Sequence, residues 1–206
     1  MNKIAERAAA KRQRVIEAAA LVFRRHGFAQ TSMDNIAVAA GMSRPALYLV
    51  FPNKEGIFAA AVHYMGDLAL AASRQGLAQR SSLEEKLLFI CEQWAGRGYD
   101  RMKENPDAKD LIDPAFPPVR EVYEKLQRLL AELLADSVRR SGLRTTPDQV
   151  ARIIVASMRG FKEAAKDSAD IRRILSLQIS ILIRGLEPRS SIGPSPGSSR
   201  PDSRFT

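Results

Sequence analysis

Residues 31–51 constrain the fold more than any other stretch, because they have the pattern of two short helices joined by a tight turn. Ile36, Ala37 and Ala40 give the first helix an apolar face at helical spacing. Gly41 follows them, and glycine is the residue best suited to the left-handed backbone that ends a helix. We therefore expect the first helix to end near Gly41 and a second helix to begin directly after it.

The residues at the starts of these two helices fit the same interpretation. Thr31 and Ser32 can cap the first helix, and Asp34 stands three residues after Thr31, which is the spacing of a capping box. Ser43 can cap the second helix, and Pro45 lies in its first turn, where a missing N–H costs nothing. Both helix starts are thus predicted from local chemistry.

Three positions distinguish this stretch from a generic helix pair. Ala37 is small enough for two crossing helices to approach closely, Gly41 turns the chain, and Leu47 points inward together with Phe51. This small–glycine–apolar spacing is typical of a helix-turn-helix, whose second helix enters the major groove of DNA by its N-terminal end. An ordinary helical hairpin with a glycine turn is the alternative.

The surrounding sequence favours the first interpretation, because residues 15–58 closely resemble the N-terminal domain of the tetracycline-repressor (TetR) family of bacterial transcription regulators. One departure is Val50, where many members carry a histidine or another polar residue, so one phosphate contact is in question. The separated residues that carry the resemblance are Ala18, Phe23, Gly27, Thr31, Ile36, Ala37, Gly41, Ser43, Leu47, Tyr48, Phe51, Lys54 and Glu55.

Candidate DNA contacts follow from exposure and chemistry on the second helix, and the resemblance supports them. Arg44 is the first candidate for base readout, most naturally as a bidentate contact to guanine. Pro45 and Ala46 can contact a thymine methyl, and Tyr48 can give its hydroxyl to a phosphate or pack beneath the helix instead. The remaining candidates are the exposed Leu49 and the phosphate contacts Thr31, Ser32, Ser43 and Lys54.

Charge is concentrated in the same region. The chain has a net charge of +9, and residues 1–55 hold nine Lys and Arg against four Asp and Glu. Residues 56–188 hold twenty against eighteen, which is close to balance. A basic chain favours an anionic partner such as nucleic acid. The cluster of Lys11, Arg12 and Arg14 is either a basic arm near the DNA backbone or a solvated helix start.

The rest of the chain predicts an all-α protein: an N-terminal three-helix helix-turn-helix domain followed by a C-terminal helical ligand-binding and dimerisation domain. We expect a DNA-binding domain over 1–54 with its motif at 32–51, an effector-binding and dimerisation domain over 55–187, and a disordered tail over 188–206, which is rich in Ser, Gly and Pro. A helix from 54 to 77, about 36 Å long, would act as a lever between the two domains. A further helix is predicted to begin at about 82, and a proline-rich loop is predicted over 105–118. The last three predicted helices cover about 119–141, 147–167 and 169–186.

The last predicted helix is apolar around most of its circumference, so it must be buried on two sides. Another subunit is the simplest source of the second side, and a central core helix in a monomer is the alternative. The last two helices are therefore expected to form half of a four-helix homodimer interface, which the resemblance also implies. The predicted interface residues are Ile154, Met158, Ile171, Ile174, Leu175, Ile179, Leu182 and Leu186.

The resemblance implies an effector pocket between about 55 and 165, whose occupation moves the lever helix and releases DNA. An apolar or amphipathic small molecule is expected, because few charges interrupt the apolar helix faces. Each candidate lining residue can equally be plain core. These candidates are Cys91, Trp94, Tyr99, Met102, Phe116, Met158 and Phe161.

No catalytic, metal or cofactor site is predicted. The two histidines, His26 and His63, lie far apart, and the single cysteine Cys91 excludes an internal disulfide or a multi-cysteine zinc site. No uninterrupted apolar run reaches the length of a membrane span, and Arg24 and Arg25 end the N-terminal apolar run where a signal peptide would need a cleavage site. We expect a cytoplasmic, dimeric, ligand-responsive repressor acting on a near-palindromic operator. A constitutive DNA-binding protein and a small-molecule-binding protein with a vestigial helix-turn-helix are the alternatives.

Overall fold

A computed structural model describes residues 3–187, and within that range every element is a helix, which confirms the all-α prediction. The predicted disordered tail, 188–206, lies outside the described residues. In chain order the elements are α1 Lys3–His26, α2 Met33–Ala39, α3 Arg44–Tyr48, α4 Lys54–Leu77, α5 Leu83–Cys91, the π-helix η1 Glu92–Gly96, α6 Arg97–Glu104, the 3-10 helix η2 Pro106–Ile112, α7 Pro117–Ser141, α8 Pro147–Ala164 and α9 Ser168–Leu186.

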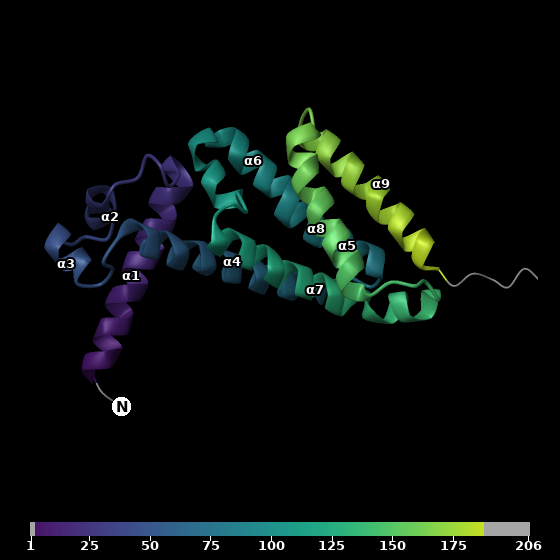
Figure 1. Ribbon diagram of the computed structural model, residues 1–206, viewed down its shortest axis with the longest axis horizontal. Coiled ribbons are helices and arrows are strands. Elements are labelled where there is room, and N and C mark those ends of the chain that lie inside the picture. The colour runs from purple at the N-terminus through teal and green to yellow at the C-terminus, as the bar shows by residue number, and fades with distance from the viewer. Residues whose placement is uncertain (1–2, 188–206) are drawn as a thin grey trace, which may run out of the picture.

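The molecule is elongated, with α1, α2 and α3 at one end and α5 to α9 at the other (Figure 1). The lever helix α4 runs from the first group to the second and has the predicted bounds of 54 and 77. By length and composition alone α4 would pass for a membrane-spanning helix. In the fold it packs against both α1 and α7, which accounts for its apolar faces.

Local chemistry accounts for most of the helix ends in the second half of the chain. Ser82 begins α5 with a full capping box, in which the backbone N–H groups of Ser81 and Ser82 bond the Glu85 carboxylate and lower its pKa. Thr146 begins α8 in the same way, as the sequence predicts. Gly142 ends α7 with a left-handed φ of 67°.

The interior consists of two hydrophobic clusters. The N-terminal cluster is formed by α1 to α3 and the first half of α4, and it also takes in Val119 and Val122 of α7. The C-terminal cluster is formed by α5 to α9. Trp94 and Tyr123 pack against both clusters, so these two side chains lie at the boundary between them. The proposed domain division at residue 54 thus falls inside the N-terminal cluster and stays a prediction about function.

The helices α4 and α7 pack closely at Gly66. A Cβ atom at this position would come within 2.5 Å of a methyl group of Val122, so only glycine lets the two helices pack at this distance. Asp67, the residue after Gly66, forms an ion pair of 2.5 Å with Lys125, about one turn beyond Val122 on α7. The two helices are therefore held together near the middle of α4.

Candidate DNA-reading surface and ligand cavity

The helix-turn-helix forms as the sequence predicts, with one change in its first cap. Ser32 caps α2 and makes a capping box with Asn35, while Thr31 takes no part. Gly41 has a φ of 65° and reverses the chain, and the Ser43 hydroxyl accepts the N–H of Ala46 to cap α3. The prediction of a capping box between Thr31 and Asp34 was therefore wrong by one residue, because the box joins Ser32 and Asn35.

The surface that α2 and α3 present to solvent carries most of the predicted DNA contacts. Leu47 and Phe51 are buried beneath α3, whereas Tyr48 is 42% exposed and Leu49 is 86% exposed. Ser32, Ser43 and Pro45 are also exposed, and Ala46 is half-buried. Val38 on α2 is 80% exposed beside this surface, and the sequence pattern gave no reason to single it out. These exposed apolar side chains suit contact with thymine methyl groups, a role that stays a prediction.

Arg44, the predicted base reader, is held by a local network. Its guanidinium forms a 3.0 Å ion pair with Asp34 and bonds the Tyr48 hydroxyl at 3.4 Å. The hydrogen bond to Tyr48, followed by the charge of Asp34, raises the pKa of Arg44 above its usual value. Because both partners are exposed, this network is weak in water and can be exchanged for a base edge.

Two of the residues predicted to contact phosphate bond other groups of the protein instead. Thr31 is only 3% exposed, and its hydroxyl donates to the carbonyl of Gly27 at 2.6 Å, so its assignment as a phosphate contact was wrong. The Lys54 ammonium donates to the carbonyls of Phe28 and Thr31, each at 2.8 Å, and lies 4.3 Å from the centre of the Phe28 ring. Lys54 therefore ties the loop before α2 to the start of α4.

Arg12, one of the basic residues near the N-terminus, also makes structural contacts, as Lys54 does. Its guanidinium lies 4.0 Å from the centre of the Phe51 ring and donates to the carbonyl of Val50 at 3.4 Å. It thereby joins α1 to the turn after α3. The neighbouring Arg14 is exposed, and its role near DNA stays a prediction.

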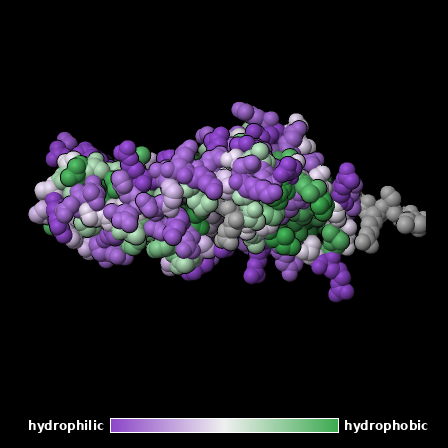
Figure 2. Space-filling model, turned by 90° about the horizontal axis from the view of Figure 1, so that it is seen from above, coloured by the Kyte–Doolittle hydropathy of each residue, from purple (hydrophilic) through white to green (hydrophobic). Residues whose placement is uncertain are grey.

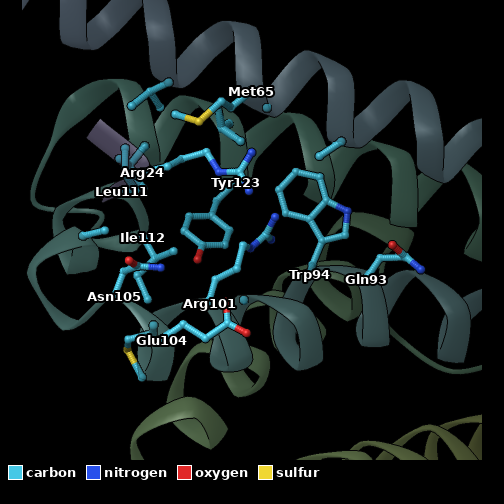
Figure 3. Close-up of a pocket in the computed structure, with 18 of the residues that line it drawn as sticks. Arg24, Met65, Gln93, Trp94, Arg101, Glu104, Asn105, Leu111, Ile112 and Tyr123 are labelled. Atoms are coloured by element: carbon cyan, nitrogen blue, oxygen red, sulfur yellow. The ribbon is translucent and has the colours of Figure 1, made fainter. Parts of the chain in front are cut away.

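A cavity of about 530 Å³ lies at the boundary between the two clusters (Figure 3). Its size falls within the range of small-molecule sites. It is lined from α1, α4, η1, α6, η2 and α7, and Trp94 and Tyr123 both face it. The Trp94 indole N–H bonds the Ser73 hydroxyl of α4 at 3.1 Å, which fixes the ring between α4 and the π-helix.

Of the seven residues predicted to line an effector pocket, two line this cavity: Trp94 and Met102. The others lie elsewhere because helical spacing alone cannot distinguish a cavity wall from core. Phe116 packs on Phe28 and Phe58, with ring centres 5.7 and 5.3 Å apart. The remaining four belong to the C-terminal cluster or pack against it: Cys91, Tyr99, Met158 and Phe161. Burial raises the pKa of Cys91 to about 12, so it is a neutral thiol.

The cavity is also more basic than the sequence suggested. Arg24, Arg25 and Arg101 line it, and the guanidinium groups of Arg24 and Arg101 turn toward each other between Tyr123 and Trp94 (Figure 3). Burial, followed by the charges of Arg24 and Arg97, lowers the pKa of Arg101. The expectation that few charges interrupt the apolar helix faces does not hold at this cavity, because charged residues of α1 and α6 meet there from distant parts of the chain.

The cavity wall is joined directly to the loop that precedes the helix-turn-helix. Gly27 has a φ of 68°, and a Cβ at this position would lie 1.8 Å from the carbonyl oxygen of Asp107 in η2. One carboxylate oxygen of Asp110 accepts the N–H groups of Phe28 at 2.8 Å and Ala29 at 3.2 Å. Since η2 also lines the cavity, a single short element touches both the cavity and the loop before the helix-turn-helix.

The predicted dimer-interface residues are mostly buried inside one subunit. Six of the eight are at most 5% exposed and belong to the C-terminal cluster: Ile154, Met158, Ile171, Leu175, Ile179 and Leu186. Ile174 and Leu182 are half-buried. The exposed apolar side chains on these helices are instead Ile153 of α8 with Leu177 and Ile181 of α9, each about 60% exposed. Figure 2 shows an apolar patch at this end of the molecule, beside the point where the described chain ends.

Metal-binding groups of three or more His, Cys, Asp or Glu side chains do not occur among residues 3–187. His63 pairs with Glu121 at 2.9 Å and so joins α4 to α7.

Comparison with known proteins agrees with this geometry. Residues 15–61 match the family described as bacterial regulatory proteins, tetR family. The chain is 30% identical over 122 residues to the HTH-type transcriptional regulator RutR of Escherichia coli K12, which covers 50% of this chain and 58% of RutR. The chain therefore spans about half the length of that curated relative.

Solved structures share the fold over nearly the whole chain. A TetR-family transcriptional regulator from Pectobacterium atrosepticum has a TM-score of 0.66 at 20% identity, covering 92% of this chain and 100% of that one. The regulator FadR of Bacillus subtilis, solved with stearoyl-CoA, has a TM-score of 0.63 at 15% identity, covering 84% and 98%. The helix-turn-helix at residues 33–48 lies within the stretch that matches the tetR family of bacterial regulatory proteins, and nearly the whole chain shares its fold with solved regulators of that family.

Proposed function

We propose that this protein is a homodimeric, sequence-specific transcription repressor of the bacterial cytoplasm that releases its operator when a small molecule fills the cavity. The observation that carries the proposal is that one element, η2, lines the cavity and also bonds the loop before the helix-turn-helix through Asp110. A regulator needs such a connection, because a ligand shifts DNA affinity only if it changes the domain that reads DNA. The proposed activity involves no chemical reaction, cofactor or metal.

The DNA-reading role rests on the exposed edge of α2 and α3. Arg44 would leave Asp34 to reach a base edge, with Ser32, Ser43 and Tyr48 on nearby phosphates. Removing Asp34 should therefore strengthen DNA binding, since it frees Arg44 and removes a negative charge near the phosphates. Removing Arg44 should weaken binding to the operator by about tenfold to a hundredfold and relax the preference at one base pair.

The test is DNA protection by the purified protein on the DNA flanking its own reading frame, at physiological salt with competitor DNA. Protection of a near-palindrome, lost in Arg44→Ala and strengthened in Asp34→Asn, supports the proposal. Binding that is weak and equally salt-dependent for every sequence contradicts it. Selective binding that no ligand of the cavity changes favours the alternative of a constitutive DNA-binding protein.

The dimer would form through the exposed apolar patch of α8 and α9 with a second copy of the chain. Leu177 and Ile181 are four residues apart and so share one face of α9, with Ile153 on the neighbouring helix. Two recognition helices about 34 Å apart would then reach successive major-groove faces. Sedimentation of Leu177→Arg should show monomers. Leu68→Arg, which alters a leucine that is 54% exposed on α4, should leave the dimer intact.

A ligand in the cavity is plausible on physical grounds and by comparison. Its walls are largely apolar, and the B. subtilis FadR structure was solved with stearoyl-CoA, an amphipathic molecule. An amphipathic effector therefore fits the expectation from the sequence. A coupling of about 1–3 kcal/mol between the two sites is enough to lower DNA affinity several-fold or more.

A further inference from the structure

Building on the effector role proposed above, we propose that the cavity selects an anionic amphiphile and that Arg24, Arg25 and Arg101 hold its charged head group. The apolar body of the ligand lies along α4 and α7. The bound head group thereby joins the last turn of α1, which belongs to the DNA-binding domain, to α6 of the C-terminal domain.

The first support is that these cations have no anionic partner among the residues that the structure describes. Within residues 3–187, the guanidinium groups of Arg24, Arg25 and Arg101 form no ion pair within 4.0 Å and no hydrogen bond with a described residue. Other arginines of the same domain are paired, such as Arg74 with Glu132 at 3.1 Å. Glu104 also lines the cavity, yet its charge has the smallest influence on Arg101.

The second support is the local electrostatics. Arg24, Arg25 and Arg101 line one cavity, and the guanidinium groups of Arg24 and Arg101 turn toward each other there (Figure 3). Desolvation, followed by repulsion from Arg24 and Arg97, lowers the pKa of Arg101, while all three arginines keep a part exposed to solvent. Cations held together in this way repel one another, and the repulsion is stronger where water is partly excluded. A carboxylate or phosphate placed between them removes this repulsion and gains charge-assisted hydrogen bonds, for which the planar guanidinium is well suited.

The third support is the polarity of the remaining walls. On α4 and α7 the lining is apolar and small, formed by Val62, Met65, Gly66, Ala69, Val119 and Val122. Tyr123 lies next to the arginines, and burial raises its pKa to about 12, so near neutral pH it is an uncharged phenol and does not compete with an anion. Asn105 and Gln93 add neutral polar groups. The cavity therefore has a cationic pole and an apolar side, which matches a molecule with a charged head and an apolar body.

The position of the cationic pole determines what the ligand connects. Arg24 and Arg25 lie in the last turn of α1, whose other residues form the core under the recognition helix. Arg101 lies on α6. An anion shared between these helices favours the arrangement that brings them together. By linkage, operator binding and anion binding must alter each other's affinity by the same factor.

The experiment uses Trp94, the only tryptophan of the chain, as a fluorescent reporter inside the cavity. Three probes with the same ten-carbon chain are titrated below their micellar concentrations: decanoate, decanol and decyltrimethylammonium. We expect decanoate to bind at least about tenfold more tightly than decanol, and the cation to bind most weakly. Raising the salt concentration should weaken decanoate binding and leave decanol binding unchanged.

Variants identify the head-group site. Arg101→Gln and Arg24→Gln should each weaken decanoate binding about tenfold without changing decanol binding. Arg120→Gln is the matched control, because Arg120 is exposed on α7 and does not line the cavity. Equal binding of decanoate and decanol, equal effects of the variants on both, or no binding of any probe would overturn the inference.

The DNA protection assay separates this inference from the proposed function. Decanoate binding through the arginines, in a protein that reads no DNA sequence selectively, would uphold the anion site and contradict the repressor. Selective operator binding without a preference for the anionic probe would contradict the anion site alone.

Discussion

Two groups of cations near the DNA-binding domain differ in what surrounds them. Arg12 and Lys54 donate to backbone carbonyls and lie over aromatic rings, so their charges hold the helix-turn-helix in place. Arg24 and Arg101 face the cavity with no ion pair among the described residues. The difference teaches that the charge of a residue says little about its role. A cation whose protons are already bonded maintains structure, whereas a cation without a partner retains its potential for a ligand.

The largest effect is expected from a substitution at Gly27, where the two regions meet. Gly27→Ala adds a Cβ that would lie 1.8 Å from the Asp107 carbonyl oxygen, at a residue whose φ is 68°. We expect a loss of about 3 kcal/mol or more in the free energy of unfolding, since backbone strain and overpacking each cost about 1–3 kcal/mol. Denaturant unfolding measures it. Gly41→Ala, with a similar φ and open space around its Cβ, should lose only about 1 kcal/mol, and equal losses would refute the steric part.

The next effect tests the bonded cations. Lys54→Met keeps the length of the side chain and removes the ammonium from two carbonyls. A hydrogen bond to a charged group contributes about 1.5–3 kcal/mol, so a loss of about 2 kcal/mol in unfolding free energy is expected. Thermal unfolding followed by circular dichroism checks this value. A stable Lys54→Met protein that binds DNA poorly would instead return Lys54 to the phosphate contacts.

A smaller effect is expected at the connection between cavity and loop. Asp110→Ala leaves the N–H groups of Phe28 and Ala29 to water and should cost about 1 kcal/mol, because only one of the two bonds is partly buried. Its more informative result concerns coupling. In the repressor proposed here, the variant should keep its DNA affinity but respond less to a cavity ligand. Asp113→Ala, which alters a carboxylate that bonds only within its own turn, is the control.

The smallest effect sharpens the contrast. Arg101→Met should change the free energy of unfolding by no more than about 0.5 kcal/mol, and in the stabilising direction, because it relieves repulsion and breaks no ion pair with a described residue. Denaturant unfolding at low and high salt measures the change, which salt should abolish. Destabilisation comparable to that of Lys54→Met would mean that Arg101 is also a structural cation.

The sequence predicts the helix-turn-helix well because its determinants are local. Ser32, Gly41, Ser43 and Leu47 act through neighbours within a few residues, and each has the expected structural place. The bounds of α4 also agree with those expected, and the structure shows that its start is set locally by the Asn53 side chain, which accepts the N–H of Gly56. The fold class follows in the same way, because helical periodicity is continuous through most of the chain.

The cavity is predicted poorly because it depends on contacts between distant residues. Arg24 and Arg101 are separated by 77 positions and look like ordinary solvated charges in the sequence, because only the fold brings them to the wall of one cavity. Phe116 is a large aromatic residue of the kind that often lines a pocket, but its ring packs against Phe28 and Phe58. The π-helix at 92–96, which the sequence does not indicate, offsets Trp94 from ordinary helical spacing.

The contact between Gly66 and Val122 has a mechanical consequence. Gly66 stands twelve residues after the start of α4 and eleven before its end, so α7 supports this rod at its middle, about 18 Å from the DNA-binding end. Ion pairs extend this contact to both sides of Gly66, from His63 with Glu121 at 2.9 Å to Arg74 with Glu132 at 3.1 Å, so α7 braces α4 along about three turns and not at a single point. A displacement at the far end of α4 would thus carry α7 with it, and the two helices would move as one stiff unit.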